Sequence, residues 1–244
     1  MDQRTVLARH PVYAALPPEV LGKIAARGVF RRYRRGDSIW KKGDPAREFF
    51  IVVQGLVALF VPCGAGRSIM VGLFEPGQSV GDVHALEGSS YSSAAFAFTT
   101  PQTVLALDRV EVLATLAQHG AAALALGRGL GRVSEQLTRR LALSTTTADA
   151  RLARILLDLG ERFGDELEDG SVLIPLRVTR AQLASLVGAT VETTIRTLSR
   201  WHRDGHIVSD ELGIVIKHPA QLASLAGNED IAGPEAAPPP GFEV

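Results

Sequence analysis

The chain has 244 residues, and its 26 Lys and Arg residues balance its 26 Asp and Glu residues to a formal net charge of zero. This length accommodates two compact domains with separate cores. A neutral total excludes nucleic-acid binding driven by bulk charge, so any basic footprint must be local.

The single cysteine, Cys63, excludes an intrachain disulfide and a four-cysteine iron–sulfur cluster. The first residues lack the apolar core of a signal peptide, and no apolar run approaches the length that spans a membrane. We therefore expect a cytoplasmic protein with no membrane partner.

The N-terminal part predicts a β-rich domain, which we place at residues 1–118. A short helical lead over residues 11–27 contains Pro17 and Pro18 at a helix start. From Val29 to Leu107, short runs of β-branched and aromatic residues alternate with glycine turns. This spacing favours an all-β roll or jelly roll.

A long helix is expected over residues 119–145. Its apolar residues recur at steps of four, three, four and four, which is typical of a seam that pairs with another helix. Packing of this seam on the chain's own roll is the alternative. The seam residues are Leu126, Leu130, Val133, Leu137 and Leu141.

A third region, residues 146–226, starts after a polar break with a helix over residues 148–163. An acidic and exposed turn is expected at residues 164–170. Thr179 and Gln182 then have the capping-box spacing that marks the start of another helix, and Gly188 ends that helix tightly.

The next helix follows almost at once, because Thr190 can cap it. Two short helices joined by a glycine turn form a helix-turn-helix, whose second helix enters the DNA major groove. An ordinary helical hairpin is the alternative. Thr194, Leu198 and Trp201 are expected on the buried side of this helix, and Glu192, Arg196, Arg200 and Arg203 on its outer side.

Two β-branched runs, at residues 206–208 and 213–217, predict the hairpin of a winged helix-turn-helix. Beyond it, residues 227–244 are rich in proline and acidic residues, and we expect a disordered tail there.

The segment VTRAQLASLVGATVETTIRTL resembles the DNA-reading motif of the CRP/FNR family of bacterial transcription regulators. Within it, VETTIR is similar to the branch typified by the fumarate and nitrate reduction regulator, as is the segment at residues 221–227. The glycine spacing in GDSIWKKGDPAREFFIVVQGLVALF resembles the family's cyclic-nucleotide-binding β-roll. The resemblance implies an α+β fold with an N-terminal β-roll sensor domain, a long dimerisation helix and a C-terminal winged helix-turn-helix.

Glu192 and Arg196 lie four residues apart, so one helix face carries both. A carboxylate can accept from cytosine N4 and a guanidinium can bond guanine O6 and N7, and the matching family residues read the half-site core. Val191 stands where the catabolite-type members of the family have an Arg, so the resemblance implies a TTGA-like half-site over a TGTGA-like one. Ile195 departs from the serine of the fumarate and nitrate reduction branch. A solvated ion pair between Glu192 and Arg196 is the alternative. The residues expected to contact phosphates are Thr179, Arg180, Thr190 and Thr193.

Family members that bind cyclic AMP use a Gly-Glu pair for the ribose and an Arg-Ser/Thr-Ala run for the phosphate. The matching positions are Gly81-Asp82 and Ser92-Ser93-Ala94. Asp reaches less far than Glu, and Ser92 supplies no cation, so cyclic AMP is not expected to bind. The effector pocket implied by this match comprises Gly81, Asp82, Val83, His84, Ser92 and Ser93.

The identity of the signal stays open. Haem is one candidate, with His10, His84 or His119 as an axial ligand, although an ordinary surface or core histidine is the favoured explanation of each. Redox control through Cys63 and control by dimerisation alone are two further alternatives.

The expected partners are double-stranded DNA, a second copy of the chain and, as the family implies, RNA polymerase at the acidic turn 165–169. No catalytic or metal-binding residue is predicted, and we do not expect an enzyme. A cupin-like metal enzyme, the remote alternative, needs clustered His and Glu ligands, whereas the histidines of this chain are scattered.

Overall fold

The computed structural model describes residues 1–64, 68–143, 146–209 and 213–227. The chain divides into two compact units, which we call the roll unit (Met1–Ala142) and the winged unit (Leu143–Val244). Residues 228–244 of the expected tail lie outside the described residues.

The roll unit begins with three short helical elements, α1 (Gln3–Arg9), η1 (Tyr13–Ala15) and α2 (Pro18–Arg27). The strands are β1 (Val29–Tyr33), β2 (Ser38–Trp40), β3 (Glu48–Gln54), β4 (Val57–Pro62), β5 (Ser68–Phe74), β6 (Ser79–Val80), β7 (Ala94–Ala97) and β8 (Gln102–Asp108). Helix α3 (Asp82–Glu87) lies between β6 and β7, and α4 (Arg109–Gln118) and the long α5 (Gly120–Leu143) follow β8.

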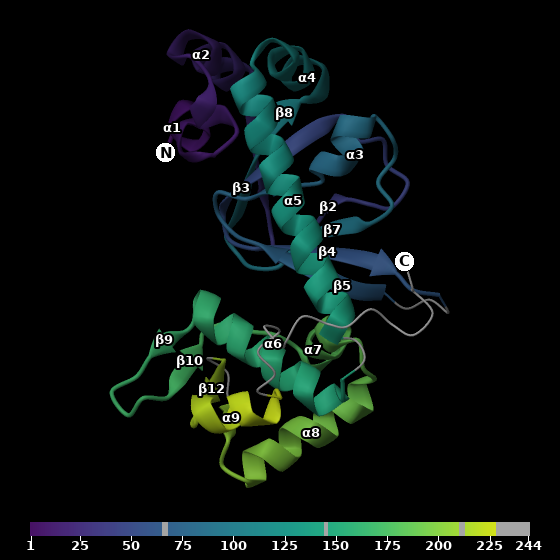
Figure 1. The fold of residues 1–244 in the computed structure, drawn as a ribbon, viewed down its shortest axis with the longest axis vertical. Coiled ribbons are helices and arrows are strands. Elements are labelled where there is room, and N and C mark those ends of the chain that lie inside the picture. The colour runs from purple at the N-terminus through teal and green to yellow at the C-terminus, as the bar shows by residue number, and fades with distance from the viewer. Residues whose placement is uncertain (65–67, 144–145, 210–212, 228–244) are drawn as a thin grey trace, which may run out of the picture. The chain divides into compact units, whose positions relative to one another are not determined.

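Two antiparallel sheets form the roll in the described part of the chain, with strand orders β1-β8-β3-β6 and β2-β7-β4-β5. Strand β3 is apolar on both faces because it lies between two cores. Phe49 and Ile51 join the core formed with α1, α2 and α5, whereas Phe50 and Val52 join the core formed with the other sheet. Figure 1 shows α5 as one long helix beside the roll.

The winged unit is built around α6 (Ala148–Phe163), as predicted, and the hydroxyl of Thr147 caps this helix. Helix α6 contacts α7 (Arg180–Val187), α8 (Val191–Arg203), α9 (Pro219–Leu225) and strand β10 (Val172–Ile174). Its apolar stripe Leu152, Leu156 and Leu159 is buried. The helix is therefore the scaffold for the two helices of the helix-turn-helix (Figure 1).

The predicted wing hairpin is present as β11 (Ile207–Ser209) paired with β12 (Ile214–Ile216). Strand β12 also pairs with β10, and β10 pairs with β9 (Asp165–Glu166). The acidic segment expected to be only a turn therefore begins as a short edge strand, because β10 offers it an unpaired backbone edge. The two units confirm the α+β class, with an N-terminal β-roll and a C-terminal winged helix-turn-helix.

Candidate nucleic-acid interface

Helix α7 has both halves of the predicted capping box. The Gln182 N–H donates to Thr179 Oγ1 at 3.1 Å, and the Thr179 N–H donates to Gln182 Oε1 at 2.9 Å. Gly188 ends the helix with φ of +67°, in the left-handed region that glycine adopts without strain. Only two residues then separate this turn from α8, so the caps fix how the two helices meet.

Helix α8 has one buried side and one exposed side. Thr194, Leu198 and Trp201 are buried as predicted, together with Thr197. Glu192 and Arg196 are exposed, and no salt bridge joins them among the described residues. Their charges are therefore not held in an ion pair with each other.

The residues expected to contact phosphates lie around the two helix starts. Thr179 and Thr190 are the N-caps of α7 and α8, and both hydroxyls accept from backbone N–H groups. The Thr190 hydroxyl also donates to Thr193 Oγ1 at 2.9 Å. Arg180 is the first residue of α7 and is half-buried. All four thus lie at the positive ends of two helix dipoles.

The first turn of α6 carries two polar side chains that the sequence did not single out. Asp149 accepts from Thr197 Oγ1 at 2.6 Å and from an Arg200 guanidinium nitrogen. Partial burial acts to raise the pKa of Asp149. These two hydrogen bonds and the charge of Arg196 outweigh that effect, so the pKa lies below its ordinary value. Arg151 donates from Nε to the carbonyl oxygen of Val187 at 2.9 Å. No sequence spacing signals these contacts, because their partners lie 36 to 51 residues away.

The residues expected to form an effector pocket differ in their hydrogen-bond partners and in their exposure. Ser92 donates its N–H to His84 Nε2 at 3.2 Å, and its hydroxyl lies 2.9 Å from the same nitrogen. Asp82 instead hydrogen-bonds to Ser79, and burial raises the pKa of its carboxyl to about 7. The other members differ in exposure: Gly81 is half-buried, Val83 is exposed and Ser93 is buried.

The three histidines considered for haem differ in their surroundings. His10 is buried, its Nδ1 accepts from the Val12 N–H at 3.3 Å, and its Nε2 lies 2.8 Å from Ser79 Oγ. Both nitrogens are therefore engaged within the protein. His84 is engaged at Nε2 by Ser92, and His119 is half-buried at the end of α4. Cys63 is exposed, and no cluster of three or more His, Cys, Asp or Glu residues suits a metal ion within the described residues.

The expected seam along α5 changes its surroundings along the helix. Leu126 is buried and Leu130 is half-buried, and both pack in the roll unit's own core. Val133 and Leu137 are 41% and 46% exposed. The side chain of Leu141 lies outside the described part of the structure. The first two seam residues thus pack on the chain's own roll, which was the alternative expectation. The next two are exposed to solvent.

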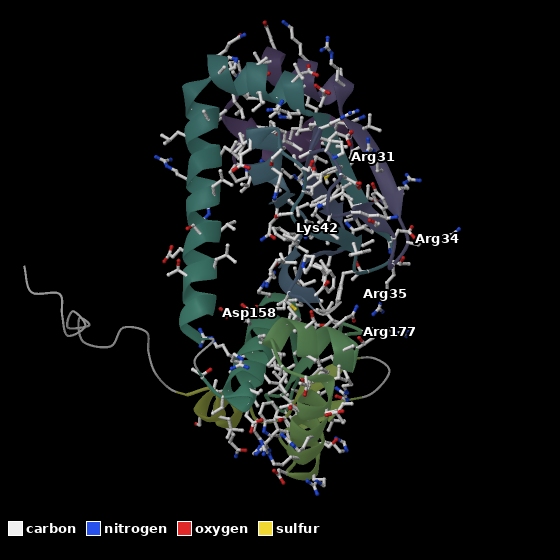
Figure 2. All side chains as sticks on the ribbon, turned by 90° about the vertical axis from the view of Figure 1, so that its right-hand side faces the viewer. Arg31, Arg34, Arg35, Lys42, Asp158 and Arg177 are labelled. Atoms are coloured by element: carbon white, nitrogen blue, oxygen red, sulfur yellow. The ribbon has the colours of Figure 1, made fainter. Side chains whose placement is uncertain are left out.

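The densest basic segment lies in the roll unit rather than around the helix-turn-helix. Residues 31–47 contain seven Arg or Lys and two Asp residues. Figure 2 labels Arg31, Arg34 and Arg35 along one edge of the roll. Arg31 is bound to Glu48 through two guanidinium nitrogens. Neither Arg34 nor Arg35 lies in a motif that the sequence links to nucleic acid.

No single helix in the described parts of the chain is long and apolar enough to cross a membrane. Among the described helices, α4 and the first part of α5 reach the required length and hydropathy when taken together, and a bend of 114° separates them.

Two domain families match the chain. The Crp-like helix-turn-helix domain matches residues 150–225, and the cyclic nucleotide-binding domain matches residues 30–119. The CRP-like protein Clp of Xanthomonas campestris pv. campestris is 32% identical over 72% of this chain and 78% of its own length. The CRP-like cAMP-activated global transcriptional regulator of Mycobacterium tuberculosis is 25% identical over 93% of this chain and 100% of its own length.

A solved structure has the same fold. The c-di-GMP responsive global regulator CLP of Xanthomonas campestris superposes with a TM-score of 0.70 at 22% identity, covering 82% of this chain and 99% of that protein.

Proposed function

The chain belongs to the CRP/FNR family of DNA-binding transcription regulators, and on that premise we propose that it acts as a homodimer reading a palindromic operator with α8. The homodimer presents two copies of α8. A two-fold protein matches a two-fold operator when the half-site centres lie about 34 Å apart, one turn of the duplex.

One observation carries this proposal: the exposed side of α8 presents a carboxylate and a guanidinium that are not paired with each other. Glu192 and Arg196 are both exposed, while the opposite side of the helix is buried. A carboxylate accepts from cytosine N4, and a guanidinium donates to guanine O6 and N7. We therefore assign the G·C pair of a TTGA-like half-site to these two side chains.

The experiment begins by selecting duplexes from a random library with the wild-type protein. An enriched inverted repeat containing TTGA is expected. Substituting its G·C pair should weaken wild-type binding by about 1–3 kcal/mol. The double variant Glu192→Ala with Arg196→Ala should bind the selected and the substituted duplex almost equally, because both side chains that discriminate are gone.

Arg180→Ala is the comparison variant, because a phosphate contact carries no sequence information. It should weaken binding to all duplexes alike and keep the preference for the G·C pair. If the double variant kept that preference too, the assignment of base reading would be wrong. Failure to enrich any sequence would reject operator reading altogether.

The signal that we propose for the roll is not cyclic AMP. The Ser92 N–H and hydroxyl, which match the family's phosphate-binding run, already bond to His84. The matching acid, Asp82, is turned to Ser79. Neither Arg nor Lys stands among the six expected pocket residues to balance a buried phosphate. Millimolar cyclic AMP should leave both the melting temperature and operator affinity unchanged, and a rise in either would contradict this.

We also propose that the protein works in the cytoplasm, where its DNA lies. There, residues 165–169 contact RNA polymerase. All five residues are exposed, and four of them, including Asp169, are acidic. Asp169 accepts from Ser171 and Lys217, which lowers its pKa to about 2 and keeps it charged. Neutralising Asp165, Glu166 and Glu168 should reduce run-off transcription without changing operator affinity; unchanged transcription would contradict the contact.

A further inference from the structure

One carboxylate on α6 holds two positions of α8. Asp149 lies in the first turn of α6, just after the cap residue Thr147. One of its oxygens accepts from Thr197 Oγ1 at 2.6 Å, and the other accepts from an Arg200 guanidinium nitrogen. Thr197 is buried and Arg200 is exposed. The carboxylate therefore spans the border between the buried and exposed sides of α8.

The position of this border relative to the base-reading side follows from helix geometry. Residues four apart are separated by about 40° around a helix axis, so Arg200 lies beside Arg196. Thr197 lies about 100° beyond Arg196, toward the buried side. Two bonds, three residues apart along α8, end on a single side chain. They restrain the rotation of the helix about its axis and its position along that axis, in addition to the packing of its buried side.

Arg151, two residues further along α6, secures the other helix of the pair. Its Nε donates to the carbonyl oxygen of Val187, the last residue of α7, at 2.9 Å. Another of its nitrogens donates to the carbonyl oxygen of Thr146, immediately before the α6 cap. The start of α6 thus holds α7 and α8 by separate side chains, and the charge of Asp149 bonds it to α8.

We propose that Asp149 is a positioning residue for DNA reading, which sets the rotation of α8 that presents Glu192 and Arg196 and keeps Arg200 from the phosphate backbone. This inference rests on the proposed function of α8. An arginine released beside the base-reading side would find phosphates within reach of its long side chain. It would add affinity for every sequence and none for the correct one, so holding it on a carboxylate favours discrimination.

The test measures the ratio of operator affinity to scrambled-duplex affinity and the dependence of the dissociation constant on salt. In Asp149→Ala, α8 loses its rotational restraint and Arg200 is released. We expect the affinity ratio to fall roughly tenfold. The slope of log affinity against log salt should steepen by about 0.9, the value for one additional phosphate contact.

Single-bond variants separate the two roles. Thr197→Val removes one bond and leaves Arg200 on Asp149, so the ratio should fall while the salt slope stays as in the wild type. Asp149→Asn keeps an acceptor for Thr197 but removes the charge that holds Arg200, so the slope should steepen. In the double variant Asp149→Ala with Arg200→Ala, the slope should return to the wild-type value.

Asp158→Asn is the matched control, because Asp158 is another carboxylate of α6, paired at 3.2 Å with Arg162 on the same helix. Its position on the winged unit is labelled in Figure 2. This variant should change neither the ratio nor the slope. Melting temperatures are measured for every variant, and titrations are run well below the lowest of them. Should Asp149→Ala fail to fold, Asp149→Asn and Thr197→Val carry the slope and the ratio tests.

The outcomes distinguish this inference from the function on which it rests. A wild-type protein that prefers no duplex rejects the proposed function before any variant is compared. A wild-type protein that prefers its operator, with variants of Asp149 that lower the melting temperature but leave ratio and slope unchanged, gives Asp149 a purely structural role and overturns the inference.

Discussion

At the scale of single residues, a buried chain of hydrogen bonds fixes the protonation of His10. The Val12 N–H donates to His10 Nδ1, so this nitrogen carries no proton. His10 Nε2 lies 2.8 Å from Ser79 Oγ, and Ser79 is hydrogen-bonded to the Asp82 carboxylate. All three bonds are satisfied when Nε2–H donates to Ser79 and the Ser79 hydroxyl donates to Asp82. The imidazole is therefore neutral.

His10 and Asp82 respond to pH in opposite directions. Burial lowers the pKa of His10 from 6.5 to about 4, so only the unfolded chain takes up this proton between those values. The contribution of His10 to stability is thus lost as the pH falls through that window. Burial raises the pKa of Asp82 from 3.8 to about 7, so the folded chain keeps a proton that the unfolded chain releases. Its contribution is lost as the pH rises from 3.8 through 7.

Asp82→Asn separates the two contributions, because asparagine resembles the neutral acid in shape and keeps an acceptor for Ser79. The variant should be about as stable as the wild type near pH 4. At pH 8 it should be more stable, by about 2 to 4 kcal/mol, because it avoids a buried charge. Chemical denaturation at pH 4.5, 6 and 8 measures the difference. A difference independent of pH would show that Asp82 is ionised in the folded protein.

At the scale of an element, the seam of α5 is buried at one end and exposed further along. Substitutions in the two parts should therefore affect different properties, the stability of the roll and the dimer. Leu126 is 7% exposed, so Leu126→Ala should reduce the free energy of unfolding by about 2–5 kcal/mol. Val133 and Leu137 are 41% and 46% exposed. Val133→Asp with Leu137→Asp should leave the roll folded and convert the expected dimer to monomer, because a charge cannot be buried in a helix seam without a partner.

Leu124→Asp is the control for the seam, since Leu124 is 56% exposed and lies on the opposite side of α5 from Leu126. It should leave the mass unchanged. Light scattering after size exclusion gives the mass of each variant, and circular dichroism confirms folding. Equal masses for the control and the double variant would place the dimer contact, if there is one, elsewhere.

The elements that sequence predicted best are those with local signals. Thr179 and Gln182 determine the start of α7, and Gly188 determines its end. Each of these residues lies at the helix end that it determines. Strand β7 has only a weak local signal, because its sequence AAFA has low intrinsic strand preference. It forms because β2 and β4 pair with it on either side. The bond between Thr197 and Asp149 spans 48 residues, so only the folded chain reveals it.

At the scale of the whole molecule, a net charge of zero conceals an uneven distribution. Residues 31–47 have seven basic and two acidic residues, whereas residues 177–217 have six and four. Clustered charge creates a local potential even when the total is zero. The roll unit should therefore attract polyanions regardless of their sequence, while discrimination between sequences depends on α8 in the winged unit.

Replacing Arg34, Lys41 and Lys42 by Ala tests this separation, since all three are exposed. The triple variant should elute from heparin at lower salt than the wild type and keep the same ratio of operator to scrambled-duplex affinity. The control replaces Arg4, Arg9 and Lys23, which are also exposed but lie on α1 and α2. Both variants lose three positive charges, so a response to net charge alone predicts equal elution. If the first variant elutes at lower salt than the control, the potential must be local. Screening limits the electric field of each charge to about 10 Å at 0.1 M salt.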